Sequence, residues 1–131
     1  MSNTNSHQIV FIDSAIEEWN SLVASFTPGT NWHLINSEQD GLVQIAARLQ
    51  GQADINAIHI ISHGADGTLS LGDGVITRTS LNMQRERLES IGNSLSDSGE
   101  ILIYGCNVAK TLEGRQFIDT ISQCANTRIA A

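Results

Sequence analysis

The sequence predicts an α/β fold, a three-layer α-β-α sandwich built on a mainly parallel sheet of about five strands. Short apolar runs alternate with segments in which apolar residues recur every three or four positions, a pattern typical of strands joined by helices. The runs are apolar almost throughout, which indicates strands that are covered on both faces.

The first strand and helix are expected near the start of the chain. Residues 8–13 form a short β-rich run that ends at a polar residue, and this predicts a buried strand. Ser14 follows, with Glu17 three residues later, which is the spacing of a helix-capping box. Apolar residues at helical spacing continue to Phe26, and Pro28 ends the predicted helix.

A second helix is expected between two further strands. Residues 32–36 and 57–62 are apolar runs that predict these strands. Between them, Ser37 and Asp40 offer helix caps and Gly51 a helix end. Helices between apolar strands favour right-handed crossovers, so we expect the strands to run parallel.

A small β-hairpin is predicted after the third strand. Residues 68–71 and 75–77 contain strand-forming side chains, and residues 72–74, Gly-Asp-Gly, mark the turn between them. Ser80 is expected to start a helix that buries apolar side chains through Leu95.

The last elements are a strand, a helix and a final strand. Residues 100–104 predict the fourth core strand and residues 128–131 the fifth. A helix from Thr111 to Cys124 is expected to turn its apolar side inward. The inward residues are expected to be Leu112, Phe117, Ile118, Ile121 and Cys124.

Composition excludes several classes of function. The 131 residues predict one domain over 1–131, and the abrupt apolar end suggests a fragment of a larger protein. With 14 acidic and 7 basic residues, the chain lacks the basic surface that nucleic acids or anionic membranes require. The sequence contains no apolar run long enough to span a membrane, and from its polar first residues no signal peptide is expected. Its cysteines and histidines lack a zinc-binding spacing, so neither metal nor cofactor is expected.

Three residues that could take part in a reaction lie at the ends of predicted strands. Asp13 ends the first strand, His63 follows the third and Cys106 follows the fourth. Reactive groups of open parallel sheets gather beyond the carboxyl ends of strands, and a histidine beside a cysteine suits thiol nucleophilic catalysis. The backbone N–H groups of Gly64 and Cys106 are candidates for an oxyanion hole. The simpler interpretation is a buried core cysteine and a surface histidine.

The order of these residues resembles that of the caspase-like cysteine peptidases. This superfamily, which includes caspases, gingipains, clostripain-like enzymes, separase and CHAT peptidases, has one apolar strand that ends in His-Gly and a later one that ends in the catalytic cysteine. Residues 58–64 and 101–107 match this pattern. The chain resembles more closely an uncharacterised bacterial domain, domain-of-unknown-function family 4347, found near the N-termini of very large, repeat-rich surface or secreted proteins. Further matching stretches are residues 10–14, 40–46, 69–72 and 104–109.

The resemblance to the peptidases implies roles for individual residues. His63 would be the general base and Cys106 the nucleophile, with Gly64 as an oxyanion donor. Asp13, and secondarily Asp66, would line a pocket that favours arginine or lysine before the scissile bond. The alternatives are that Asp13 caps the first helix with Ser14 and that Asp66 is a turn residue.

Three functions are therefore compared. The leading one is a cysteine peptidase-like domain that cleaves a peptide or protein, including its own parent chain, at a secreted or cell-surface location. The second is an inactive caspase-fold module for interaction or anchoring, because fold alone does not determine function. The third, a flavodoxin-like binder of small molecules, lacks a glycine-rich phosphate loop after the first strand. Of the other histidines, His59 is expected to contact a core helix and His33 to lie on an edge strand.

Overall fold

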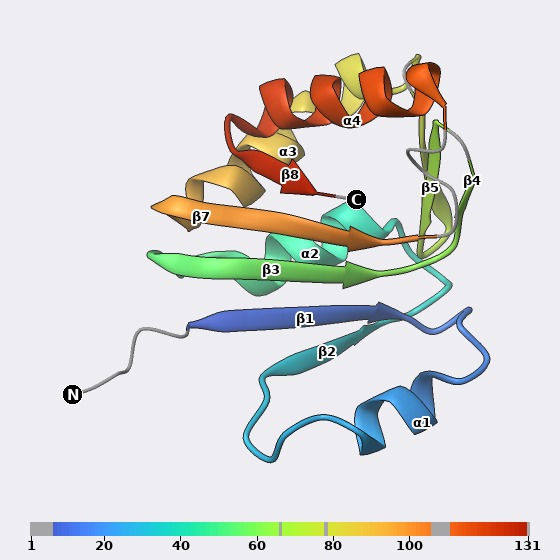
Figure 1. Cartoon of the computed structure of the whole chain (residues 1–131), viewed down its shortest axis with the longest axis vertical. Helices are drawn as coiled ribbons and strands as arrows, with labels where there is room; N and C mark the ends of the chain where they lie inside the picture. The colour runs from blue at the N-terminus through green and yellow to red at the C-terminus, as the bar shows by residue number, and fades with distance from the viewer. Residues whose placement is uncertain (1–6, 66, 78, 106–110, 131) are drawn as a thin grey trace.

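A computed structural model describes residues 7–65, 67–77, 79–105 and 111–130, and it has the α/β fold that the sequence predicts (Figure 1). The strands are β1 (Gln8–Asp13), β2 (Trp32–Ile35), β3 (Ile55–Ile61), β4 (Gly64–Ala65), β5 (Thr68–Leu71), β6 (Gly74–Thr77), β7 (Leu95–Tyr104) and β8 (Arg128–Ala130). The helices are α1 (Trp19–Ala24), α2 (Gly41–Leu49), α3 (Leu81–Asn93) and α4 (Leu112–Ala125).

The main sheet has five parallel strands in the order β2-β1-β3-β7-β8. The predicted fold class is thus confirmed, including the hairpin after β3, which joins β4 in a three-stranded antiparallel sheet. The strand order reverses between β1 and β3, so the chain leaves their carboxyl ends in opposite directions. This is the place in an open α/β sheet where a crevice for ligands forms.

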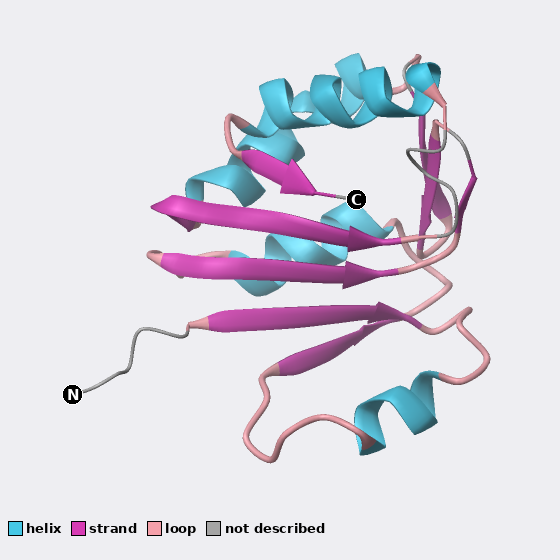
Figure 2. Ribbon diagram, viewed as in Figure 1, coloured by secondary structure: helices cyan, strands magenta, loops and turns pink. Residues whose placement is uncertain are grey.

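One face of the sheet carries most of the hydrophobic core. Neighbouring strands align their buried side chains in rows, because parallel pairing places Ile9 beside Ile58 and Phe11 beside Ile60. Helices α2, α3 and α4 cover this face (Figure 2). Helices α3 and α4 approach closely at Gly92, where a Cβ atom would lie 1.9 Å from the carbonyl oxygen of Ala125. As predicted, Cys124 is a buried core residue.

The opposite face of the sheet carries only the short helix α1 among the described elements. Trp19 of α1 contacts Trp32 of the edge strand β2, with ring centroids 6.4 Å apart. His59 lies on this face and contacts strand residues, so the expected contact with a core helix is wrong. Its Nε2–H donates to the amide oxygen of Gln8 (2.8 Å), while the Tyr104 hydroxyl donates to Nδ1 (3.0 Å).

The first helix begins later than the sequence predicts. Its N-cap is Glu18 rather than Ser14, because Asp13 accepts hydrogen bonds from the backbone N–H groups that follow it and so holds these residues in a turn. The Asp13 carboxylate accepts from Ala15 N–H (2.9 Å), and its main-chain oxygen accepts from Ile16 N–H (3.0 Å). An Asp side chain that binds nearby backbone in this way competes with helix formation.

One expected burial and one expected element in the second half are wrong. Leu112 is not buried, whereas Leu95 packs against the core as expected but from a strand. Leu112 is the first residue of α4 and is 66% exposed. Leu95 belongs to β7 and not to the preceding helix, which ends at the Ser94 cap. The other expected inward residues of α4, among them Phe117, are buried. No helix in the described part of the chain has both the length and the apolar character of a membrane span.

Two residues of α4 give a matched test of this packing. Phe117→Ala removes a side chain that is 0% exposed, and it should lower the free energy of unfolding by about 3–5 kcal/mol. Leu112→Ala, at the exposed start of the same helix, should change it by less than about 0.5 kcal/mol. Urea unfolding followed by circular dichroism measures both, and equal losses would contradict the packing described for α4.

The His59 site predicts a dependence of stability on pH. Burial lowers the pKa of His59 below 6.5, and this outweighs the opposing effect of Glu100. The unfolded chain therefore binds the proton more readily, so the free energy of unfolding should fall as the pH drops below about 6.5. The loss should be smaller in His59→Gln than in the wild type, whereas His7→Gln, at an exposed histidine, should behave as the wild type. Urea unfolding at about pH 7.5 and about pH 5.5 measures this, and equal losses in His59→Gln and wild type would contradict it.

Candidate active site

A cavity of about 570 Å³ opens at the carboxyl ends of β1, β3 and β7. Its lining comprises residues 15–18 of the β1–α1 turn, Ser62 and His63 after β3, and Tyr104 and Gly105 at the end of β7. The cavity therefore lies at the edge of the sheet where the strand order reverses, as expected for a ligand site in this fold.

The ends of β3 and β7 are bonded to each other at this cavity. Ser62 N–H donates to the carbonyl oxygen of Tyr104 at 3.2 Å. His63 and Gly105, each one residue further along, both line the cavity. The two strand ends that the sequence predicts to carry the reactive residues are thus neighbours.

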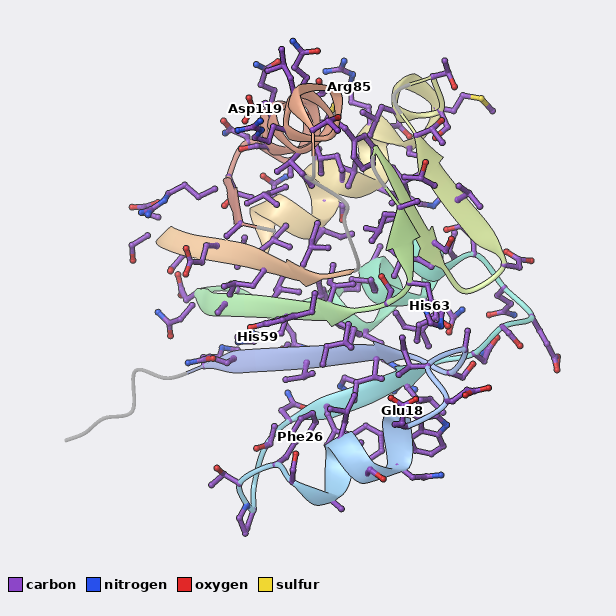
Figure 3. All side chains as sticks on the ribbon, turned by 45° about the vertical axis from the view of Figure 1, so that its right-hand side comes forward. Glu18, Phe26, His59, His63, Arg85 and Asp119 are labelled. Atoms are coloured by element: carbon purple, nitrogen blue, oxygen red, sulfur yellow. The ribbon has the colours of Figure 1, made fainter. Side chains whose placement is uncertain are left out.

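His63 is held from two sides. Its main-chain oxygen accepts from Ser70 N–H of the hairpin (2.9 Å), and its ring Nε2 lies 3.1 Å from the carbonyl oxygen of Ala15. Figure 3 shows the His63 side chain at the end of β3. A carbonyl oxygen only accepts hydrogen bonds, so Nε2 carries the proton in this contact. In the neutral ring, Nδ1 is then the atom that accepts a proton.

Asp13 lies beneath this arrangement rather than in the cavity wall. Its side chain is 2% exposed, and both carboxylate oxygens are occupied. Oδ1 accepts from Ala15 N–H (2.9 Å), and Oδ2 accepts from Gly72 N–H (2.9 Å) of the hairpin. The described lining of the cavity does not include Asp13, and its two hydrogen bonds support the turn and the hairpin. The pocket role of Asp13 stays a prediction.

The acidic groups in the wall are Glu17 and Glu18, which both have exposed side chains. The described lining contains no lysine or arginine, so the charged side chains there favour a cationic ligand. Reasoning from the sequence missed both residues because it placed them inside a helix. Their place just after the end of a central strand was the available signal.

Ser62 is the other polar group at the cavity. Its side chain is 3% exposed, and its hydroxyl has no hydrogen-bond partner within the described residues. A buried hydroxyl without a partner carries a cost in free energy. Gly64, the predicted oxyanion donor, starts β4 beside His63 and pairs with Leu69.

Two predicted site residues, Cys106 and Asp66, lie outside the described residues. Gly105, which precedes Cys106 in the sequence, lines the cavity. The nucleophile and oxyanion roles therefore stay predictions. Within the described ranges, no three histidine, cysteine or acidic side chains are grouped to hold a metal ion.

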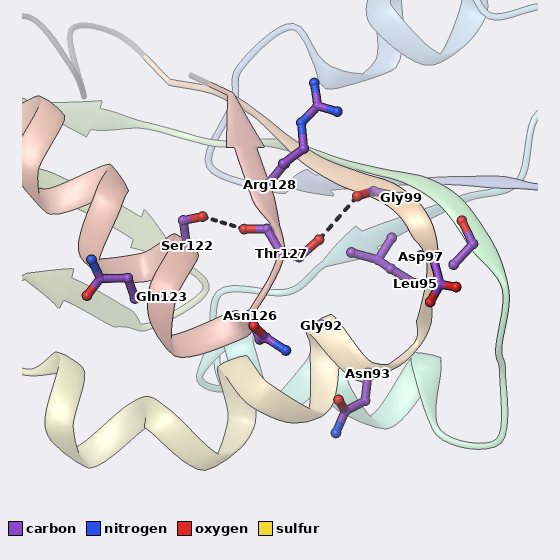
Figure 4. A pocket seen from close by; sticks show the side chains of 11 residues that line it. Gly92, Asn93, Leu95, Asp97, Gly99, Ser122, Gln123, Asn126, Thr127 and Arg128 are labelled. Carbon is purple, nitrogen blue, oxygen red and sulfur yellow. Dashed lines mark hydrogen bonds between the residues drawn. The ribbon is translucent and has the colours of Figure 1, made fainter.

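A larger groove of about 740 Å³ lies at the opposite edge of the sheet, between the ends of α3 and α4 and the starts of β7 and β8 (Figure 4). Hydroxyl groups already bond to backbone there: Thr127 donates to Gly99 O (3.2 Å), and Ser122 donates to Thr127 O. Its described lining holds no histidine or cysteine. The smaller cavity at the carboxyl edge is therefore the better candidate for a reactive site.

Comparison with known proteins identifies a family but no characterised relative. No curated protein and no solved structure matches the chain. The family model described as Domain of unknown function (DUF4347) matches residues 9–131. Since the match spans almost the whole chain, the protein belongs to the DUF4347 family.

Proposed function

We propose that this domain is a cysteine peptidase of the caspase-like type, in which His63 is the general base and Cys106 the nucleophile. The observation that carries the proposal is the contact of His63 Nε2 with the Ala15 carbonyl at 3.1 Å. A base that is oriented by a second group is a recurring feature of nucleophilic catalysis. Here the orienting carbonyl leaves Nδ1 to take the proton, in a cavity whose wall includes the residue before Cys106.

The proposed reaction follows from these roles. His63 Nδ1 takes the thiol proton as the Cys106 sulfur attacks the peptide carbonyl carbon, and the Gly64 and Cys106 N–H groups stabilise the oxyanion. The C–N bond then breaks, His63 returns the proton to the leaving amine, and a thioester remains. Water, deprotonated by His63, hydrolyses the thioester and restores the thiol.

The substrate class follows from the cavity wall. Glu17 and Glu18 place two carboxylates beside His63 without a basic side chain in the described lining. Their charges favour a peptide with lysine or arginine next to the scissile bond. Glu17 and Glu18 would thus provide the same preference for lysine or arginine that the resemblance implies through Asp13 and Asp66.

Support also comes from the order of the motif residues. His63-Gly64 follows β3 and Gly105-Cys106 follows β7, its neighbour in the sheet, which is the arrangement that the resemblance to caspase-like peptidases implies. The sequence has a second cysteine, Cys124, which is buried in the core and provides a matched control.

A mixture of peptides covering many sequences, incubated with the purified protein and analysed by mass spectrometry, tests the proposal. The wild type should cut after lysine or arginine, and fragments of the protein itself would reveal self-processing. Cys106→Ala and His63→Ala should each lower the rate by about 10²-fold or more, whereas Cys124→Ala should cleave as the wild type. Cleavage that persists in Cys106→Ala, or no cleavage by the folded wild type, would contradict the proposal, and the second result would favour the inactive interaction module.

A further inference from the structure

Asp13, Ala15 and His63 form a chain of hydrogen bonds from a buried carboxylate to the candidate base. Asp13 Oδ1 accepts from Ala15 N–H at 2.9 Å, and the Ala15 carbonyl accepts from His63 Nε2–H at 3.1 Å. We propose that Asp13 is a positioning residue, which selects the ring tautomer of His63 by fixing the Ala15 carbonyl. Its consequence for catalysis rests on the proposed function, whereas its effect on the tautomer does not.

The turn that presents this carbonyl is bonded at three successive N–H groups. Ser14 N–H donates to Ile35 O (2.9 Å), Ala15 N–H to the Asp13 carboxylate and Ile16 N–H to Asp13 O (3.0 Å). The peptide unit that joins Ala15 to Ile16 is therefore bonded on both sides, through its N–H to Asp13 O and through its C=O to His63. Since a peptide unit is planar, fixing the turn also fixes the direction of the carbonyl.

The second carboxylate oxygen supports the backbone of His63. Oδ2 accepts from Gly72 N–H (2.9 Å), which holds the hairpin against the end of β1. The same hairpin donates Ser70 N–H to the main-chain oxygen of His63 (2.9 Å). Gly72 has φ +62°, and a Cβ atom there would lie 2.1 Å from Gln39 O, so the hairpin fits this place only with glycine. The buried Asp13 side chain thus holds both the turn whose Ala15 carbonyl accepts from the His63 ring and the hairpin that bonds to the His63 backbone.

The tautomer decides whether His63 presents an acceptor. With the proton on Nε2, the neutral ring accepts a proton at Nδ1, whereas the opposite tautomer has an N–H there. If the Ala15 carbonyl moves, the ring is free to adopt both forms. In functional histidines, the hydrogen bond made by one ring nitrogen commonly determines which nitrogen carries the proton.

The test compares two aspartates that both bind backbone N–H groups. In Asp13→Asn, an amide nitrogen replaces one carboxylate oxygen and cannot accept a hydrogen bond. The bond from either Ala15 N–H or Gly72 N–H is therefore lost. Asp40 uses Oδ1 alone to accept from Leu42 N–H (2.8 Å) and Val43 N–H (3.3 Å), so Asp40→Asn retains both bonds. Asp40 thus provides a control of the same chemistry outside the turn of residues 14–16.

Long-range ¹H–¹⁵N correlation of the labelled full chain at alkaline pH reads the tautomer of His63 directly. We expect the Nε2–H form alone in the wild type and Asp40→Asn, and a mixture of both forms in Asp13→Asn and Asp13→Ala. Asp13→Asn provides the decisive readout if Asp13→Ala does not fold. A folded Asp13→Asn that keeps the Nε2–H form alone, or a wild type that lacks this preference, would overturn the proposal.

Kinetics separate this proposal from the proposed function. With a cleaved peptide as substrate, Asp13→Asn should lower kcat by up to about 100-fold while KM stays within about twofold, because Asp13 does not line the described cavity. An unchanged kcat beside a changed tautomer would refute the catalytic consequence alone. A wild type that cleaves no peptide but has the Nε2–H form would refute the proposed function and leave the positioning role intact.

Discussion

The carboxylate of Asp13 joins the segments that surround His63. Burying a charged group is costly unless hydrogen bonds replace those lost from water, and here two backbone N–H groups, from Ala15 and Gly72, do so. Through Ala15 the carboxylate sets the turn that contacts the imidazole, and through Gly72 it holds the hairpin that follows His63. The geometry of the carboxyl edge therefore depends on this one side chain.

The parallel sheet supplies the rigid frame for these contacts. Buried aliphatic rows fix the register of β1, β3 and β7, so the three strands end together at one edge. The turn after β1, the small antiparallel sheet after β3 and Gly105 after β7 therefore start from adjacent strand ends. Sites built from loops on a rigid scaffold are common because loops vary without loss of the core.

Much of this arrangement was predictable from local sequence, and the remainder depends on contacts between distant residues. Apolar runs located β1, β3 and β7, and the position of His63 follows from the end of β3. The bond from Asp13 to Gly72 joins residues 59 positions apart, which no local pattern reveals. The same side chain holds the turn after β1, so the N-cap of α1 is Glu18 and not the predicted Ser14. Glu17 and Glu18 therefore lie at the cavity and not within the helix that the sequence predicts.

The central claim, that His63 activates Cys106, is tested most directly by the rate at which iodoacetamide alkylates each cysteine of the native protein. The thiolate is the reactive species, and Cys124 is a buried internal reference. We predict that Cys106 reacts at least about 100-fold faster than Cys124 and that His63→Ala lowers the Cys106 rate at least about tenfold at neutral pH. A Cys106 rate that is unchanged by His63→Ala would contradict the account.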